Sequence, residues 1–272
     1  MLTDDGSRTL VDRRLDETFH SGCGALSECL HVYLRNSGIE ALLEPSKADR
    51  NLSACEPEGR HLPVRVLEFG FGTGMAALLT MAAAKSYRRP MEYVSLEREL
   101  LPREVLEQLE IGKAVTAAID HGRLPPRFAA ASQLENDWLE FRASLELAQR
   151  SNESSKVEEI VWDAGENVHL RLIIGDAIDY LARLKPKATA GYDAIYFDAF
   201  SPATNPEAWT YGVFKNLANL LNQNGLLVSY CVNGQVRRGL EQAGFEVKRI
   251  PGPSGGKREV LAARRANFAG AE

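Results

Sequence analysis

The segment from Val64 to Lys85 constrains the fold more than any other part of the chain. It passes from a short apolar run, VRVLEF, through the glycine-rich stretch GFGTG into the apolar run MAALLTMAAAK. This order is typical of a buried strand, a tight loop and a buried helix. Parallel strands need a crossover between them that is usually a helix, so the segment predicts the first unit of a parallel α/β sheet.

The same alternation continues along the chain, which predicts an α/β fold with a mostly parallel, doubly wound sheet. A final pair of apolar runs, separated by PGPSGG, predicts a C-terminal antiparallel hairpin. In total seven strands are expected, at about 64–69, 91–97, 169–175, 192–200, 224–230, 245–250 and 257–264.

The length of 272 residues suits one large α/β domain with a small appendage. We expect residues 1–60 to form an N-terminal extension that contributes to the active site, because they hold few strand-like runs. Residues 61–265 are expected to form the main domain. Within it, 111–168 is the least regular stretch and predicts an insertion.

Composition excludes several classes of protein. The formal charge of −5 argues against non-specific coating of nucleic acid, which depends on many phosphate contacts. The four cysteines lack paired spacing, so reduced thiols and no metal site are expected. The polar N-terminus and the lack of a long apolar run predict a soluble, cytoplasmic protein without membrane contact.

The glycine loop favours one class of cofactor. Gly70, Gly72 and Gly74 let the backbone approach a ligand closely, but Met75 stands where a dinucleotide fingerprint has its last glycine. Glu68 would repel an anionic pyrophosphate and attract an ammonium and a sulfonium. The loop therefore predicts S-adenosylmethionine as the cofactor, and the alternative is a plain tight turn between strand and helix.

Acids also follow the next three strands, and ligands of doubly wound sheets lie at these strand ends. Glu97 is placed to accept the ribose hydroxyls, or else it is a solvated charge. Asp176, with Ala177, is placed to face the adenine, and it also suits a helix cap. Asp198 is the predicted catalytic residue, since it can hold an attacking amine in line with a methyl group.

At these residues the sequence resembles the MnmC methyltransferase-domain family. The motifs that carry the resemblance are FGFGTG, IIGDA and FDAFSPATNPEAWT, with DGSRTL near the start and KRE near the end. The resemblance covers most of 3–35, 64–105 and 169–263. It implies a Rossmann-like class I fold that uses S-adenosylmethionine. Cys29 replaces the usual serine, and 111–168 matches poorly.

The resemblance also implies a substrate. It predicts methylation of the amine on 5-aminomethyl(-2-thio)uridine at the wobble position of tRNA, with Asp198 in the active site. The resemblance does not extend to the flavin-dependent oxidase half of the bifunctional family members, and a stand-alone methyltransferase form is expected. The aminomethyl group is therefore expected to come from a separate oxidase or another upstream modification enzyme.

Further residues are candidates for substrate contact. They are His20, Ser21, Phe200, Ser201, Pro202, Lys257 and Arg258. Residues 235–265 hold eight basic and three acidic side chains, which indicates either a phosphate-binding patch or a solvated surface. His20 either lies over the cofactor or amine or is structural, His31 is more typical of a structural residue, and Trp209 either stacks on a base or packs in the core.

Two other functions remain open at this point. An aminopropyltransferase of the spermidine synthase type also moves an alkyl group from a sulfonium to an amine, although its glycine loop ends in an acid that FGFGTG lacks. A non-catalytic RNA-binding protein on a methyltransferase fold is the second alternative. Acids after four successive strands count against the non-catalytic alternative.

Overall fold

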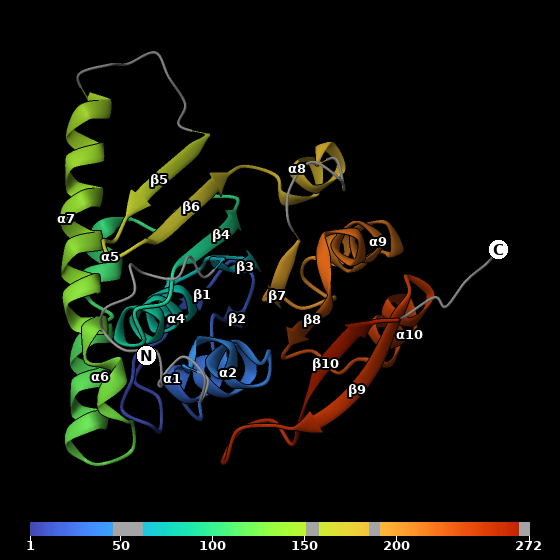
Figure 1. The fold of residues 1–272 in the computed structure, drawn as a ribbon, viewed down its shortest axis with the longest axis horizontal. Helices are drawn as coiled ribbons and strands as arrows, with labels where there is room; N and C mark the ends of the chain where they lie inside the picture. The colour runs from blue at the N-terminus through green and yellow to red at the C-terminus, as the bar shows by residue number, and fades with distance from the viewer. Residues whose placement is uncertain (46–61, 151–157, 185–190, 267–272) are drawn as a thin grey trace, which may run out of the picture.

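The central sheet of the computed structural model has eight strands (Figure 1). They are β3 (Val64–Phe69), β4 (Met91–Glu97), β5 (Glu159–Asp163), β6 (Val168–Ile174), β7 (Tyr192–Phe197), β8 (Leu221–Ser229), β9 (Phe245–Pro251) and β10 (Glu259–Arg265). Their order is β5-β6-β4-β3-β7-β8-β10-β9. The five strands from β6 to β8 run parallel, which confirms the predicted α/β class. The structure describes residues 1–45, 62–150, 158–184 and 191–266.

The prediction of seven strands was wrong by one. The extra strand is β5, which pairs antiparallel with β6 at the edge of the sheet. It has five residues that alternate between exposed and buried, and it lies in the irregular stretch 111–168. So short an edge strand leaves a weak pattern in the sequence. The C-terminal hairpin is confirmed, since β9 pairs antiparallel with β10, which also pairs antiparallel with β8.

Helices cover both faces of the sheet. One face is covered by α1 (Ala25–Glu28), the π-helix η1 (Cys29–Arg35), α2 (Ile39–Leu43), α4 (Met75–Ser86), α6 (Ile111–Asp120) and α7 (Ala130–Arg150). The other face is covered by α8 (Ala177–Arg183), α9 (Tyr211–Leu220) and α10 (Gly234–Gln242). Figure 1 shows α7 at the left of the molecule and α8, α9 and α10 at the right. The short elements are β1 (Val11–Asp12), β2 (Glu17–Thr18), α5 (Arg103–Glu107) and the 3₁₀ turns η2 (Pro126–Phe128) and η3 (Pro206–Trp209).

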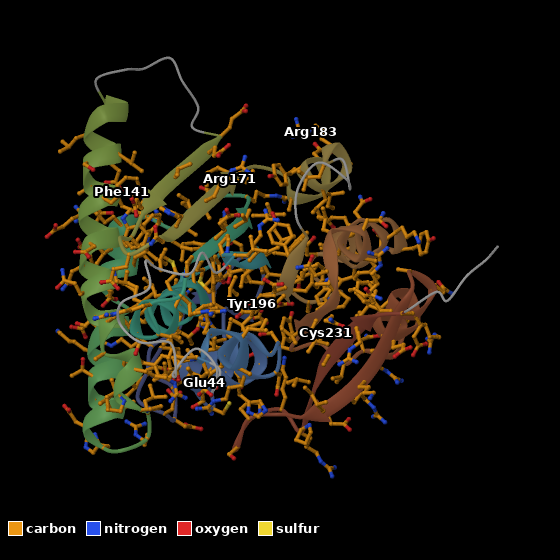
Figure 2. The ribbon with its side chains drawn as sticks, viewed as in Figure 1. Glu44, Phe141, Arg171, Arg183, Tyr196 and Cys231 are labelled. Atoms are coloured by element: carbon orange, nitrogen blue, oxygen red, sulfur yellow. The ribbon has the colours of Figure 1, made fainter. Side chains whose placement is uncertain are left out.

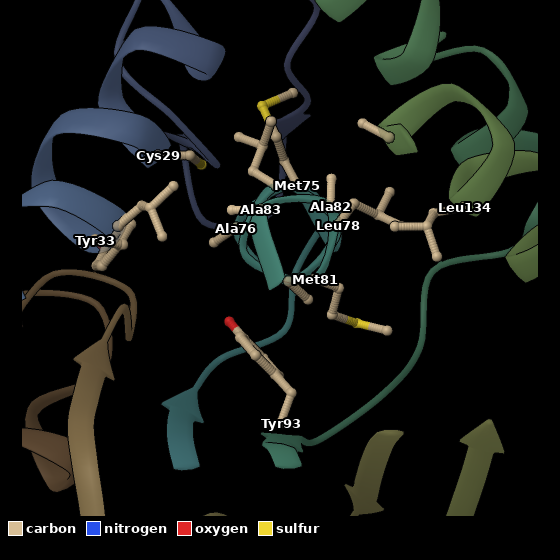
Figure 3. Close-up of a cluster of buried hydrophobic side chains, with 14 of the residues drawn as sticks. Cys29, Tyr33, Met75, Ala76, Leu78, Met81, Ala82, Ala83, Tyr93 and Leu134 are labelled. Carbon is tan, nitrogen blue, oxygen red and sulfur yellow. The ribbon is translucent and has the colours of Figure 1, made fainter. Parts of the chain in front are cut away.

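The core follows from the alternation of side chains along the strands. Val66 of β3 packs with the α4 side, whereas its neighbour Leu67 packs with the α9 side. Helix α4 is buried all round, as its uninterrupted apolar sequence predicts. Figure 3 shows it end-on, with Tyr33 on one side, Leu134 on the other and Tyr93 rising from the sheet.

The 111–168 stretch packs directly on this core. Trp138 of α7 lies 5.8 Å from the Phe71 ring and 5.2 Å from the Trp162 ring, measured between ring centroids. Phe141, labelled in Figure 2, lies on α7 as well, and its ring stacks on the Trp162 ring of β5. Helix α7 is thus fixed to the glycine loop through Phe71. Residues 46–60 of the expected extension, and 151–157 of the expected insertion, lie outside the described residues.

In the described ranges, no helix has both the length and the apolar character to cross a bilayer. The same residues contain no group of three or more histidine, cysteine, aspartate or glutamate side chains able to hold a metal ion.

Candidate active site

A pocket of about 1090 Å³ lies beyond the carboxyl ends of β3, β4, β6 and β7. Most of the residues predicted from the sequence line it: Glu68, Gly70, Gly72, Glu97, Asp176, Ala177, Asp198, His20, Ser21, Phe200, Ser201 and Lys257. Gly74, Pro202 and Arg258 are not among its lining residues. The fold therefore brings all four strand-end acids to one cavity, as parallel strands with a common edge require.

The backbone conformation and the close contacts of the loop after β3 require glycine. Gly70 has φ +96°, and a Cβ there would lie 2.7 Å from the backbone oxygen of Asp198. Only glycine lets β3 and β7 approach so closely at this point. Gly72 has φ +53° and donates its N–H to Oε2 of Glu97 at 2.9 Å. The loop is thereby joined to the ends of both neighbouring strands.

Glu68 was expected to be a charged acid facing the cofactor, but its side chain is buried. Its side chain is 1% exposed, and its Oε2 accepts a hydrogen bond from the Ser95 hydroxyl at 2.7 Å. Burial raises its pKa well above the usual value, which favours the protonated form. Attraction for a cation in this pocket therefore depends on the other carboxylates.

Glu97 and Asp176 are the acids at the ends of β4 and β6. Glu97 faces the pocket while it accepts the Gly72 N–H. Asp176 caps α8 by accepting from the backbone N–H groups of Ile178 at 2.8 Å and Asp179 at 3.2 Å. These hydrogen bonds lower its pKa, that from Asp179 most, so it is ionised at neutral pH. The predicted cap is confirmed, and Asp176 lines the pocket as well.

Asp198 lies directly after β7, and Tyr33 donates its hydroxyl hydrogen to Oδ1 of this acid. Burial raises the pKa of Asp198 to about 7, with the Tyr33 hydrogen bond and Lys257 acting to lower it and Glu28 acting to raise it. A group with this pKa exchanges a proton readily at neutral pH, which is what a general base requires.

The N-terminal segment supplies another part of the wall. Glu28 is 6% exposed and accepts the Ser21 N–H at 2.5 Å, and burial raises its pKa. His20 is buried, with Nδ1 at 3.0 Å from the Thr9 hydroxyl, and burial lowers its pKa to about 4. His20 is therefore neutral at pH 7. His31 lies outside the pocket lining and contacts the Pro251 carbonyl oxygen at 2.8 Å, a structural role as expected.

The β1–β2 hairpin closes over the loop after β7. Glu17 accepts the Ser201 N–H at 3.1 Å and also the hydroxyl groups of Ser201 and Thr204. Beside it, Phe19 contacts Phe200 edge-to-face, with 5.4 Å between the ring centroids. Ser201 and Phe200 are therefore held in place by the N-terminal segment.

The unpredicted residues of the site include four with titratable groups near Asp198 or the pocket wall: Glu17, Glu28, Tyr33 and Tyr230. Glu28 and Tyr33 fall in a stretch with helical spacing, but the π-helix that orients Tyr33 has no local sequence signal. π-helical turns frequently occur at functional sites. Of the two roles considered for Trp209, packing is the one observed, because its ring contacts Phe197 edge-to-face and its Nε1 donates to the Phe200 carbonyl at 2.8 Å.

The doubly wound sheet with its acid-lined pocket at the strand ends, together with a family match, places the chain in the class of the Rossmann-like S-adenosylmethionine-dependent methyltransferases. Residues 140–266 match the model of a family described as S-adenosyl-L-methionine-dependent methyltransferase. Within that class the chain is related to the methyltransferase part of the MnmC proteins, and the resemblance predicted from its motifs is confirmed.

Two relatives show the extent of the match. The tRNA 5-methylaminomethyl-2-thiouridine biosynthesis bifunctional protein MnmC of Cupriavidus metallidurans is 32% identical over 270 residues, covering 97% of this chain and 33% of that protein. The protein of the same name from Ralstonia nicotianae is 30% identical over 265 residues, covering 96% and 33%. The chain thus spans about a third of the length of the curated relatives it matches.

A solved structure confirms the fold. The crystal structure of MNMC2 from Aquifex aeolicus superposes with a TM-score of 0.65 at 24% sequence identity. The match covers 97% of this chain and 68% of that one, so it includes the N-terminal segment as well as the sheet.

Proposed function

We propose that this chain transfers a methyl group from S-adenosylmethionine to the amine of 5-aminomethyl(-2-thio)uridine at the wobble position of tRNA. One observation carries the proposal: Asp198, with a pKa of about 7, lines the pocket together with Glu17 and Glu28. Carboxyl groups on the wall of a pocket attract an alkylammonium. The nucleoside itself is taken from the names of the relatives.

The residues present fit the cofactor. The pocket is slightly larger than the roughly 300–1,000 Å³ usual for small-molecule sites, which leaves room for a cofactor and a target group. We assign Glu97 to the ribose hydroxyls and Asp176 with Ala177 to the adenine. Gly70 and Gly72 allow the close backbone approach. The cofactor supplies an electrophilic methyl group on a sulfonium.

The chemistry follows from the proton on the substrate. A primary alkylamine is mostly protonated at neutral pH, so its proton must leave before its lone pair can attack. Asp198 accepts that proton and frees the amine lone pair to attack. Bound S-adenosylmethionine would supply the methyl group, with the electrons of its carbon–sulfur bond retained on sulfur. The Tyr33 hydroxyl fixes the orientation of Asp198 during the transfer.

Contact with tRNA is assigned to the C-terminal hairpin and α10. Their exposed basic residues outside the pocket lining are Arg238, Lys248, Arg249, Arg258, Arg264 and Arg265. Arg249 is paired with Glu259 at 3.0 Å, so the other cations are more available to phosphate groups. A local basic surface of this kind suits an acidic protein that binds one kind of RNA.

Two further predictions from the sequence stay predictions. One is that a separate upstream enzyme supplies the aminomethyl group, and the other is that the protein is cytoplasmic.

The decisive experiment incubates the protein with methyl-labelled S-adenosylmethionine and bulk tRNA from cells that lack wobble-amine methylation. Nuclease digestion and mass analysis then identify the labelled nucleoside. The expected product is 5-methylaminomethyl-2-thiouridine or its unthiolated form. Asp198→Asn should abolish transfer while cofactor binding is retained, and Asp120→Asn, an exposed change on α6, is the matched control.

Other outcomes would revise the proposal in defined ways. Cofactor binding without transfer to tRNA would keep the class and exclude this nucleoside. Transfer of an aminopropyl group from decarboxylated S-adenosylmethionine would favour the spermidine synthase alternative. Failure to bind S-adenosylmethionine at all would exclude an enzyme of this class and leave the non-catalytic alternative.

A further inference from the structure

Lys257 lies in the turn between β9 and β10, next to Arg258. The sequence grouped the two as candidate phosphate contacts, but the structure separates them. Both residues are exposed, but Lys257 lines the pocket and Arg258 is not among the lining residues. Adjacent cations on one turn therefore face different surroundings.

The geometry of the turn fixes this difference. The Gly252 N–H donates to the Arg258 carbonyl at 2.9 Å, and a Cβ on Gly252 would lie 1.8 Å from the Lys257 carbonyl oxygen. On the other side of the turn, a Cβ on Gly256 would lie 2.6 Å from Sγ of Cys23. The turn is therefore packed against itself and against the N-terminal segment, with Lys257 directed to the pocket.

The Lys257 ammonium lies over an aromatic ring beside the predicted catalytic acid. Its Nζ is 3.8 Å from the centroid of the Tyr230 ring, a cation–π geometry. Tyr230 donates its hydroxyl hydrogen to the Ala199 carbonyl at 2.8 Å, one residue after Asp198. The ring thereby holds the ammonium close to the end of β7.

Three carboxyl groups of the pocket respond to this ammonium. Burial raises the pKa values of Asp198 and Glu28, and attraction to Lys257 acts in the opposite direction on both. For Glu17, hydrogen bonds from Ser201 and Thr204 outweigh burial, and Lys257 lowers the pKa further. One lysine thus favours the ionised form of three acids on different elements.

We propose that Lys257 is a positioning residue that favours the ionised forms of the pocket acids until the substrate ammonium takes over this role. The proposal rests on the proposed function, because it assumes a cationic amine as substrate. Asp198 is then ready to accept a proton as soon as the amine arrives. Lys257 touches neither the methyl group nor the amine in this scheme, and it acts through Asp198.

The groups around Asp198 explain why a single cation affects its pKa. The titratable and charged groups that face it in the described residues are Glu28 of α1, Cys29 and Tyr33 of η1, Glu68 of β3, Tyr230 after β8, and Lys257. Among these, Lys257 is the cation. Its loss would leave Asp198 among acids and neutral groups, and protonation would become easier.

The test is a direct titration of Asp198 by carbon NMR in protein labelled at the aspartate carboxyl carbon, with Asp198→Asn identifying the signal. In Lys257→Met the midpoint should rise by about half a pH unit or more, since the attraction of a neighbouring opposite charge contributes on that order. Lys257→Arg should restore the wild-type midpoint, and Arg258→Met, the neighbouring cation outside the pocket, should leave it in place. Lys257→Gln repeats the loss of charge with a polar side chain.

An unchanged midpoint in both Lys257→Met and Lys257→Gln would overturn the proposal. The same conclusion would follow if Lys257→Met reduced the salt slope of tRNA binding by about one without moving the midpoint, because Lys257 would then be a phosphate contact. Neither the cofactor nor RNA is needed for the titration. Its result therefore stands apart from the success or failure of the methyl-transfer assay.

Discussion

Tyr33 donates its hydroxyl hydrogen to Oδ1 of Asp198, across 165 positions of sequence. Tyr33 is 1% exposed, and burial raises its pKa well above the usual value, so the phenol is a neutral donor. Its ring packs on Tyr196 of β7 with 5.4 Å between centroids, and Tyr196 is labelled near the middle of Figure 2. The N-terminal segment therefore contributes directly to the predicted catalytic group.

Tyr33→Phe should lower kcat by about tenfold or more, since a hydrogen bond to a charged group contributes roughly 1.5–3 kcal/mol. The Tyr33 hydrogen bond lowers the pKa of Asp198, so its loss should also move the lower limb of the pH–kcat profile to higher pH. Steady-state kinetics from pH 5 to 9 measures both effects. A lower kcat with an unmoved profile would contradict the assigned contact.

Asp198→Asn should change how stability depends on pH. The pKa of Asp198 is about 7 in the folded protein, above its ordinary value, so the folded state binds this proton more tightly than the unfolded state. The resulting stability is present at about pH 4 and is lost as the pH rises through 7. Asn resembles the protonated acid and should make the protein more stable than wild type at pH 8, but not at pH 4.

Urea unfolding of both proteins at several pH values measures this difference. A constant difference in the free energy of unfolding across the range would show that Asp198 has an ordinary pKa. Asp120→Asn, on the exposed end of α6, should show no such pH-dependent gain and serves as the control.

Glu97→Ala should weaken S-adenosylmethionine binding by about 10- to 100-fold, because the carboxylate is assigned to charge-assisted hydrogen bonds with the ribose. It would also remove the acceptor for the Gly72 N–H and loosen the glycine loop. Calorimetric titration measures the affinity. Glu97→Gln keeps an acceptor for Gly72, so an affinity equal to wild type in that variant would leave Glu97 with a purely structural role.

Gly70→Ala should destabilise the protein by about 1–3 kcal/mol. The residue has φ +96°, and the added Cβ would lie 2.7 Å from the Asp198 backbone oxygen. Gly212→Ala on α9 is the matched control, because a Cβ there meets nothing within 4 Å and should stabilise the helix by about 0.4–1 kcal/mol. Thermal unfolding of the two variants compares them, and equal melting temperatures would contradict the argument from close approach.

Much of the sheet was predictable because long apolar runs carry their own signal. β3, β4, β6 and β7 were all expected from continuous apolar or alternating stretches, and α4 from its uninterrupted apolar sequence. β5 was missed, since five residues of alternating burial at a sheet edge resemble a polar loop. In the structure β5 pairs with β6, and Trp162 of β5 packs against Trp138 and Phe141 of α7.

The strand-end acids were predictable for a similar reason. Glu97, Asp176 and Asp198 each follow a recognisable strand, and parallel topology places such residues at one edge. Glu17, Glu28 and Tyr33 follow no strand of the main sheet. Glu17 and Glu28 reach the pocket, and Tyr33 reaches Asp198, only because the N-terminal segment folds back onto the loop after β7.

The sequence by itself determined the class of fold, the glycine loop and the position of Asp198, because each depends on local order: apolar run, turn, acid. Tertiary structure alone decided the ionisation of these acids. Burial favours the protonated form of Glu68 and places the pKa of Asp198 at about 7, and the turn between β9 and β10 brings Lys257 rather than Arg258 into the pocket lining. The physical reason is that the pKa of a carboxyl group reflects the desolvation and charges around it, and those come from residues far apart in the chain.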